Sequence, residues 1–370
     1  MKIGVPRERR SGETRVAATP ETVKKLVAAG HEVLVETDAG VASSQPNAAF
    51  EAAGARIVNA RDAFTTELIV KVRPPGPDEL ATLKPGTVLV GMLNPFDADG
   101  LAKLAATGVT AFALEAAPRT TRAQSLDVLS SQANIAGYKA VILAANLYQR
   151  FFPMLMTAAG TVKAARVVVL GAGVAGLQAI ATAKRLGAVI EASDVRPAVR
   201  EQVESLGAKF IDVPYETDEE RSIAEGVGGY ARPMPESWMK RQAAAVAERI
   251  KLADVVITTA LIPGRKAPVL VTEAMVESMK AGSVIVDMAV EQGGNCPLSQ
   301  MDKVVVHAGV TIAGVSNLPA LVGADASALY ARNVLDFLKL VVDKDARLHV
   351  DLDDDIVKAC LVCRDGKVTR

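Results

Sequence analysis

The stretch VVVLGAGVAG, residues 167–176, places a buried strand directly before a glycine-rich turn and the start of a helix. This order of elements is typical of a parallel α/β domain that binds a dinucleotide. Gly171 permits the tight turn, Gly173 lets a pyrophosphate approach the backbone, and Gly176 lets helix and strand pack closely. The first helical amides, from Val174 onward, would face the phosphates, because a helix N-terminus offers free N–H groups and a positive dipole end.

A carboxylate follows the next predicted strand, residues 189–192. Asp194 at this place would accept hydrogen bonds from the adenosine ribose hydroxyls and repel a 2′-phosphate, which favours NAD over NADP. Arg196 opposes this preference, because a nearby arginine can bind that phosphate. The alternative for the whole motif is a glycine-rich turn that binds no ligand.

Strands and helices alternate outward from this stretch in both directions. Apolar segments fit strands at residues 2–5, 32–36, 68–72, 87–92 and 110–114, and then at 166–170, 189–192, 209–213, 254–258, 283–287 and 304–307. Alternation of this kind predicts parallel sheets with helices on both faces.

Two long predicted helices, 125–148 and 326–342, separate these blocks of strands. With 370 residues the chain is also long enough for two domains. We therefore expect an α/β protein with two Rossmann-like, doubly wound parallel-sheet domains joined by long hinge helices. The first would be discontinuous, 1–135 plus 320–370, and the second would be 136–319, with a cleft between them.

The composition restricts the possible partners. The chain has 42 basic and 42 acidic side chains and is 50% hydrophobic, which is too apolar for a disordered protein. A balanced charge argues against nucleic acid or an anionic membrane as the main partner. The start lacks the pattern of a signal peptide, and no segment has the roughly 20 apolar residues of a membrane span. We expect a soluble chain without a direct membrane span.

The three cysteines, Cys296, Cys360 and Cys363, are too few for a disulfide scaffold and fit a reducing cytoplasm. Cys360 and Cys363 have the spacing of zinc ligands, but a structural zinc site needs four ligands and no second pair follows. His349 lies nearby in the sequence. We expect no metal, and interpret the two cysteines as small residues of a C-terminal strand or tail.

The segment 119–132 is unusually polar for the start of a long helix. Gln124, Asp127 and Ser130 recur every three residues, so on a helix they would share one face. The alternative is helix capping, with Ser125 as a cap, together with a solvated stripe.

Together these segments resemble a known family. The polar segment, GAGVAGLQAIATAKRLGA at 171–188, ALIPGRKAPVLVT at 260–272 and the start GVPRE at 4–8 are similar to the NAD(H)-binding component (domain I) of proton-translocating NAD(P) transhydrogenase, in the alanine dehydrogenase/transhydrogenase superfamily. The resemblance covers essentially the whole chain.

The resemblance implies a set of cofactor contacts. The nicotinamide side would be held by Arg119, Thr120, Thr121, Gln124, Asp127 and Ser130, with Arg119, Gln124, Asp127 and Ser130 at the reactive ring. The adenosine side would meet Asp194, Val195 and Arg196, while Ala260 and Leu261 would line the cofactor cleft. A mobile loop at about 215–238 would close over the nucleotide, with Gly229 and Tyr230 at its tip and Gln242 just beyond. The alternative for this loop is a plain surface insertion.

The resemblance also implies the activity. NADH would give its hydride directly to NADP⁺ held on a partner component, coupled to proton translocation by a membrane subunit. The chain would be the split form of the alpha subunit. It would attach peripherally to the cytoplasmic face through the NADP(H)-binding and membrane-spanning subunits, and it would be a homodimer.

Alanine dehydrogenase is the main alternative, because it shares the fold and the start of the chain. The pyruvate-binding arginine and lysine of that enzyme match Arg15 and Lys71. Its catalytic histidine falls on Asn94, and its catalytic aspartate on Glu291. An amide cannot act as a general base, whereas hydride transfer between two nicotinamides requires positioning and exclusion of water rather than an acid/base pair.

The chain contains three histidines, His31, His307 and His349, and none is adjacent to a cofactor motif in the sequence. We expect each to be structural or exposed. A third possibility, from another functional class, is a module that binds or senses NAD(H) without chemistry. The polar segment argues against it.

Overall fold

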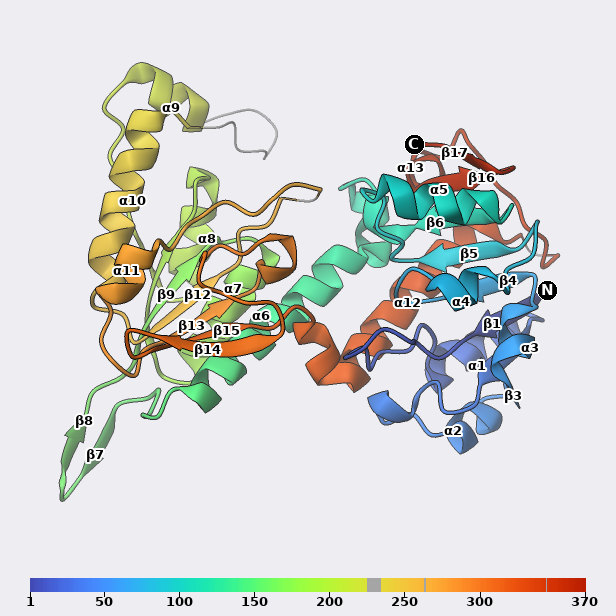
Figure 1. Ribbon diagram of the computed structural model, residues 1–370, viewed down its shortest axis with the longest axis horizontal. Coiled ribbons are helices and arrows are strands. Elements are labelled where there is room, and N and C mark those ends of the chain that lie inside the picture. Colours follow the sequence, from blue (N-terminus) through green and yellow to red (C-terminus); the bar gives the residue numbers. More distant parts are fainter. Residues whose placement is uncertain (225–233, 263, 344) are drawn as a thin grey trace. The chain divides into compact units, whose positions relative to one another are not determined.

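The computed structural model describes residues 1–224, 234–262, 264–343 and 345–370, and it divides into two compact units (Figure 1). Unit 1 consists of Met1–Gln132 and Pro319–Arg370, and unit 2 of Ala133–Leu318. Each unit contains one mainly parallel sheet with helices on both faces, so the predicted α/β fold class is confirmed. Gly229 and Tyr230 lie outside the described residues.

Unit 1 has an eight-stranded sheet in the order β17-β16-β6-β5-β4-β1-β2-β3. Its strands are β1 (Lys2–Val5), β2 (Glu32–Glu36), β3 (Arg56–Val58), β4 (Leu68–Val70), β5 (Val88–Gly91), β6 (Thr110–Ala113), β16 (Leu361–Arg364) and β17 (Lys367–Val368). The first six pair in parallel, and β16 and β17 are antiparallel. The strand order reverses at β1, so the carboxyl ends of β1 and β4 form the edge where α/β sheets usually bind ligands.

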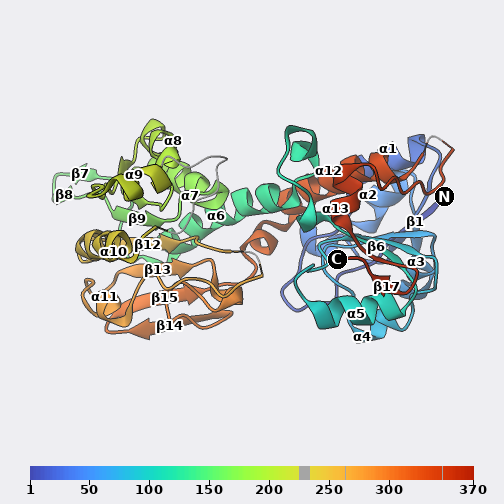
Figure 2. The same ribbon diagram turned by 90° about the horizontal axis from the view of Figure 1, so that it is seen from above.

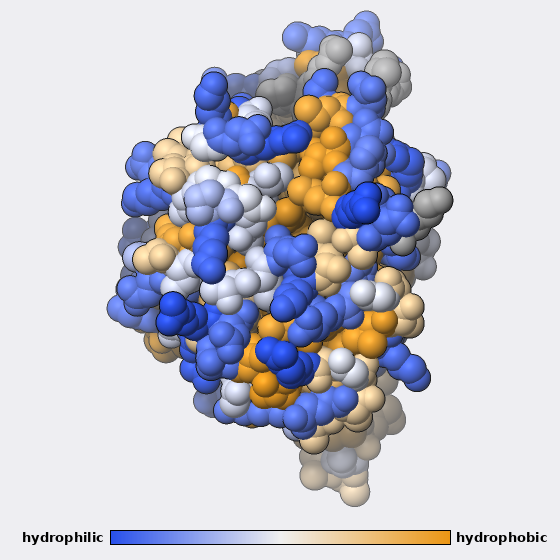
Figure 3. Space-filling view, turned by 90° about the vertical axis from the view of Figure 1, so that its right-hand side faces the viewer, coloured by the Kyte–Doolittle hydropathy of each residue, from blue (hydrophilic) through white to orange (hydrophobic). Residues whose placement is uncertain are grey.

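The two faces of this sheet are covered by different helices. One face packs on α1 (Pro20–Ala28), α2 (Asn47–Ala52), α12 (Gly323–Val341) and α13 (Asp355–Cys360). The other packs on α3 (Ala60–Phe64), α4 (Pro77–Leu80) and α5 (Ala98–Ala106). Successive strand residues alternate between the two cores: Leu68 and Val70 face the first, and Ile69 the second. The surface of unit 1 seen in Figure 3 mixes hydrophilic side chains with smaller hydrophobic areas, as the balanced charge predicts.

Unit 2 has a seven-stranded sheet in the order β11-β10-β9-β12-β13-β15-β14. Its strands are β9 (Arg166–Leu170), β10 (Val189–Ser193), β11 (Lys209–Phe210), β12 (Val255–Thr258), β13 (Val284–Asp287), β14 (Lys303–His307) and β15 (Val310–Gly314). Only β14 is antiparallel to its neighbour among these described strands. The strand order reverses at β9, which places the glycine-rich turn at the corresponding edge of this second sheet.

Helices also cover both faces of this sheet, which can be followed in Figures 1 and 2. α6 (Val128–Leu147), which crosses the unit boundary, packs on one face with α7 (Val174–Arg185) and α8 (Arg200–Ser205). The other face packs on α10 (Glu236–Ile250) and α11 (Glu273–Glu277). A hairpin of β7 (Leu155–Thr157) and β8 (Gly160–Val162) pairs only with itself within the described residues.

The structure corrects three expectations. The long helix predicted at 125–148 is broken: a 3₁₀ helix, η3 (Thr121–Leu126), ends before Asp127, and α6 begins at Val128. The segment 215–238 contains α9 (Asp218–Ala224) and the start of α10, so its described part is largely helical rather than a loop. Several strands were missing from the prediction, namely β3, β15, the β7–β8 hairpin and β16–β17, because short strands carry too few residues to show a period.

Candidate functional site

The glycine-rich turn joins β9 to α7 through close backbone contacts. Gly171 has a φ of +99°, in the region that favours glycine. A Cβ on Gly176 would lie 1.8 Å from the carbonyl oxygen of Gly171, so any side chain there would force the turn apart. The Thr259 hydroxyl, just after β12, donates to the Gly171 carbonyl at 2.9 Å. The glycines therefore have the packing roles that their spacing predicts.

The start of α7 leaves backbone N–H groups available to a ligand. Gly173 is the N-cap residue and provides no side-chain hydrogen bond, and the Val174 side chain is exposed. A Cβ on Gly173 would meet only the Arg196 Nη2, at 3.9 Å. An anion can therefore approach these amides closely, which fits the diphosphate of a dinucleotide.

Asp194 follows β10 and connects to the glycine turn. Its Oδ2 accepts the Ala172 N–H at 2.7 Å, and its Oδ1 accepts the Arg196 N–H at 2.8 Å. The Arg196 guanidinium donates to both oxygens, from Nε at 3.0 Å and from Nη2 at 3.1 Å. This hydrogen bonding to Asp194 raises the pKa of Arg196. Gln242 on α10 donates to the Asp194 carbonyl at 3.3 Å. The structure thus brings three predicted residues together at one end of the turn.

A small pocket of about 130 Å³ adjoins Asp194 and Val195. Its walls include Ile211, Val213 and Trp238, and the ring of Tyr215 stacks on Trp238 with centroids 6.4 Å apart. It has the apolar walls and nearby carboxylate that suit the adenosine half of a dinucleotide.

Ala260 and Leu261 lie just after β12, beside the glycine turn. The Ala260 carbonyl accepts from Asn295 Nδ2 at 2.8 Å, and the same amide group donates to the Pro268 carbonyl at 2.8 Å. Asn295 is fully buried and thereby holds both ends of the 260–268 segment. Sequence reasoning missed Asn295 and Thr259 as supports of the site, because their role depends on the neighbours that packing gives them.

The predicted nicotinamide residues belong to unit 1. Arg119, Thr120, Thr121 and Gln124 are exposed on and before η3. Asp127 caps α6: its Oδ1 accepts the Ser130 N–H at 2.9 Å, and its Oδ2 accepts the Ser130 hydroxyl at 2.6 Å. Capping by Asp127 explains the break in the predicted helix, since a side chain that satisfies the first amides fixes a helix start.

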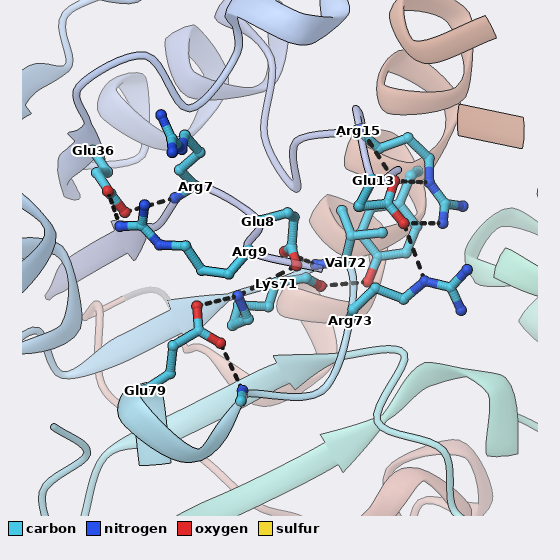
Figure 4. Close-up of polar contacts among 12 residues, drawn as sticks. Arg7, Glu8, Arg9, Glu13, Arg15, Glu36, Lys71, Val72, Arg73 and Glu79 are labelled. Carbon is cyan, nitrogen blue, oxygen red and sulfur yellow. Dashed lines mark hydrogen bonds and ion pairs between the residues drawn. The ribbon is translucent and has the colours of Figure 1, made fainter. Parts of the chain in front are cut away.

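Arg15 and Lys71 lie in a buried ion-pair network at the carboxyl edge of the unit 1 sheet (Figure 4). Arg15 pairs with Glu13, with Nη2 2.7 Å from Oε2, and also donates to Gln132 at 2.8 Å. The Lys71 Nζ lies 3.0 Å from Glu79 and 3.3 Å from Glu8. Both cations that match the pyruvate-binding residues of alanine dehydrogenase are therefore engaged by carboxylates of the same unit.

Further contacts close this network. The Glu8 Oε1 accepts the Val72 N–H at 2.6 Å, and Arg73 Nε lies 3.1 Å from Glu13 (Figure 4). Burial raises the pKa of Glu8, and the Lys71 charge opposes that rise. A cavity of about 1160 Å³ opens alongside, with Phe64 and Leu83 among its walls. It is far larger than the pocket at Asp194, but the glycine turn is in the other unit.

Asn94 and Glu291 occupy the positions of the alanine dehydrogenase histidine and aspartate. Asn94 is exposed, has a φ of +54°, and its N–H donates to Glu115 at 2.6 Å. Glu115 also accepts the Leu93 N–H, and burial raises its pKa to about 7. Glu291 is exposed on the 3₁₀ turn η5 (Val290–Gln292) after β13.

Within the described residues, one group of side chains has metal-ligand geometry. Ligand atoms of Glu273, Glu277 and His307 lie within 4.8 Å of one another, and both carboxylates are exposed. The sequence predicted no metal, and we assign none to this group, since exposed carboxylates gather without an ion. Cys360 ends α13 and Cys363 lies in β16, and both are buried free thiols whose pKa values are raised by burial, to about 12 and about 11.

No helix of the described ranges is both long and apolar enough to cross a membrane.

The comparisons with known proteins cover both units. Residues 4–136 match the N-terminal domain of the alanine dehydrogenase/PNT family, and residues 140–370 match its C-terminal domain. The chain is 53% identical over its whole length, and over 97% of the relative, to the first of the separate chains that make up NAD(P) transhydrogenase subunit alpha in Rhodospirillum rubrum. It is 32% identical, over its whole length and 95% of the relative, to alanine dehydrogenase 1 of Staphylococcus aureus.

Solved structures give the same result. The transhydrogenase structure from Sinorhizobium meliloti superposes with a TM-score of 0.90, at 48% identity and full coverage of both chains. Both its sequence and its fold confirm the resemblance found in the sequence motifs: the chain belongs to the alanine dehydrogenase/PNT family.

Proposed function

We propose that this chain is the NAD(H)-binding component of a proton-translocating NAD(P) transhydrogenase, in which hydride passes directly from NADH to NADP⁺ on a partner component. One observation carries the proposal: a glycine turn with bare helical amides, ending beside Asp194, occurs in a chain 53% identical throughout to a transhydrogenase alpha subunit. Family membership alone leaves transhydrogenase and alanine dehydrogenase both open.

Unit 2 binds the dinucleotide in this proposal. Gly171, Gly173 and Gly176 bring the backbone to the diphosphate, and the amides of Val174 and its neighbours donate to it. Asp194, Val195 and Arg196 meet the adenosine ribose and its surroundings. Ala260 and Leu261 form a wall beside the turn, and Asn295 holds that wall in place. Gln242, and Gly229 and Tyr230 outside the described residues, complete the proposed contacts.

The polar residues of unit 1 hold the nicotinamide ring. When bound, the nicotinamide itself carries the hydride, so the protein has only to orient it and keep water away. Arg119, Thr120, Thr121 and Gln124 are exposed and able to donate to a carboxamide. Asp127 and Ser130 are bound to each other, and this fixes the start of α6 from which the ring contacts are presented.

The partners follow from the same proposal. An NADP(H)-binding component supplies the acceptor, and a membrane-spanning subunit couples the transfer to proton movement. The chain attaches through these subunits to the cytoplasmic face of the membrane and works as a homodimer.

Reconstitution tests the activity. The purified chain is mixed with the NADP(H)-binding component of a transhydrogenase, NADH and an NADP⁺ analogue whose reduced form absorbs at its own wavelength. We expect reduction of the analogue only when both proteins are present. Tight NADH binding without any exchange would leave a binding or sensing module instead. NADH oxidation that requires pyruvate and ammonia would favour alanine dehydrogenase.

A substitution separates ring positioning from affinity. Gln124→Ala should slow hydride transfer at least about tenfold while changing the Kd for NADH less than about threefold, because Gln124 is proposed to orient the ring rather than anchor the nucleotide. Asn146→Ala, a change of an exposed residue near the end of α6, is the control and should alter neither quantity. Equal losses of rate and affinity for Gln124→Ala would contradict the positioning role.

A further inference from the structure

The carboxylate of Asp194 is already fully occupied by protein donors. An ionised carboxylate offers about four lone-pair sites. Here they receive the Ala172 N–H, the Arg196 N–H, and the Nε and Nη2 of the Arg196 guanidinium, at 2.7 to 3.1 Å. The Asp194 side chain is only 7% exposed, whereas that of Arg196 is 33% exposed. Ribose hydroxyls can therefore reach the carboxylate only by replacing guanidinium donors.

The Arg196 guanidinium also lies over the glycine turn. Its Nη2 is 3.9 Å from the Cβ position of Gly173, the glycine whose missing side chain leaves room for a ligand. An arginine at this place has the geometry and charge to bind a phosphate on the adenosine ribose, because a guanidinium binds phosphate oxygens through paired N–H groups. Its tie to Asp194 orients those N–H groups toward the carboxylate.

We propose that Arg196 is a selectivity residue of the dinucleotide site: it is a 2′-phosphate-binding group that Asp194 holds in check. This inference rests on the proposed function, since it concerns the same NAD(H) site. With Asp194 present, a 2′-phosphate meets a carboxylate and an arginine already paired, and NADPH binds weakly. Without the carboxylate, the guanidinium is free to turn to the phosphate, and selectivity moves toward NADPH.

The pair makes a prediction that neither residue makes alone. A carboxylate that only repels phosphate would give the same gain in NADPH affinity whether or not Arg196 is present. A restrained arginine gives a gain that disappears with Arg196. A double-mutant cycle separates the two cases, because it measures the coupling between the residues.

The test measures the Kd values of NADH and NADPH by fluorescence titration for the wild type, Asp194→Asn, Arg196→Gln and the double variant. Asparagine keeps an oxygen for the Ala172 N–H and removes the charge. We expect Asp194→Asn to bind NADPH about tenfold more tightly than the wild type, and the double variant to lose that gain. Arg249→Gln removes an arginine that pairs at 3.6 Å with Glu191, on the same strand as the Asp194 turn, and should leave the NADPH-to-NADH ratio unchanged.

Arg196→Gln by itself keeps the inference testable if Asp194→Asn folds poorly. It should weaken NADPH binding further, about threefold or more, because the carboxylate then faces the phosphate without a partner. A gain that survives in the double variant, no gain in Asp194→Asn, or an unchanged ratio in Arg196→Gln would overturn the inference. Failure of the wild type to bind NADH would overturn the proposed function instead.

Discussion

The two sheets of this chain present the same edge in opposite ways. In each, the strand order reverses at the first strand of the unit's sheet, β1 in unit 1 and β9 in unit 2, and the carboxyl ends meet at that point. In unit 1 this edge holds three carboxylates, Glu8, Glu13 and Glu79, against three cations, Arg15, Lys71 and Arg73. In unit 2 it holds a turn of glycines and the first amides of α7, which no side chain caps.

The difference teaches where a ligand can obtain binding energy. Buried ion pairs are satisfied by one another, so a ligand that competes for them must first separate opposite charges in a medium of low dielectric. Bare amides at a helix start have no such partner, and an anion that reaches them gains their hydrogen bonds outright. The same architecture therefore supplies a rigid, self-neutralised edge in one unit and a receptive edge in the other.

The largest expected effect comes from opening the charge network of unit 1. Lys71→Met would leave Glu8 and Glu79 buried without their cation, and breaking a buried pair in this way costs about 3–5 kcal/mol. Urea unfolding followed by circular dichroism would measure the loss. Adding Glu8→Gln and Glu79→Gln to Lys71→Met should restore much of it, and NADH binding should change little. A stable Lys71→Met protein would show that the network is not self-contained.

The next effect concerns the turn of unit 2. Gly176→Ala places a Cβ 1.8 Å from the Gly171 carbonyl, so the turn must move and the phosphate amides with it. We expect NADH affinity to fall at least about a hundredfold, or roughly 3 kcal/mol. Gly76→Ala in unit 1 is the matched control, because Gly76 has a φ of −73° and its nearest neighbour to a new Cβ is 3.9 Å away. Unchanged NADH binding in Gly176→Ala would remove the turn from the site.

A pH effect should distinguish the two edges. Burial raises the pKa of Glu115 from 4.5 to about 7, so the folded state binds its proton more tightly than the unfolded state. Stability from this group is complete below about pH 4.5 and is lost as the pH rises through 7. Allowing for partial exposure, the loss should be about 2 kcal/mol, from about 1.4 kcal/mol for each pKa unit.

Glu115→Gln measures this contribution. The amide keeps an acceptor for the Leu93 and Asn94 N–H groups but cannot ionise. The difference in unfolding free energy between Glu115→Gln and the wild type should therefore grow in favour of the variant between pH 5 and pH 8. A difference that stays constant over this range would show that Glu115 does not titrate there.

The smallest effect tests the support of the turn. Thr259→Val removes the hydroxyl that donates to the Gly171 carbonyl at 2.9 Å, which should cost about 1 kcal/mol and weaken NADH binding a few-fold. Thr259→Ser keeps the hydroxyl and should behave much more like the wild type. Equal effects of the two substitutions, measured by NADH titration and thermal unfolding, would assign the loss to packing rather than to the hydrogen bond.

The comparison of the two edges was only half visible in the sequence. The predicted strand 166–170 coincides with β9, and the glycines of 171–176 have the contacts that their spacing predicts, because the whole device lies within one short stretch of chain. The network of unit 1 joins residues near positions 8, 13, 71 and 79, and no local pattern relates them. Arg15 and Lys71 were recognisable only by resemblance, and their carboxylate partners only from the structure.

The misplaced elements have a similar cause. The sequence period ran without interruption from 125 to 148, yet Asp127 competes for the first amides and starts α6 at its own position. Asn295 gave no sequence signal, since its two acceptors, the carbonyls of Ala260 and Pro268, lie some thirty residues earlier in the chain.

By itself, the sequence determined the α/β class, the glycine turn and the acidic residue after the next strand, because hydrophobic period and turn chemistry act over a few neighbouring residues. Only the tertiary structure decided which charges are neutralised, which amides stay bare, and that Arg196 turns to Asp194. Those outcomes depend on which distant groups share a desolvated space, and burial sets the strength of every charge and hydrogen bond found there.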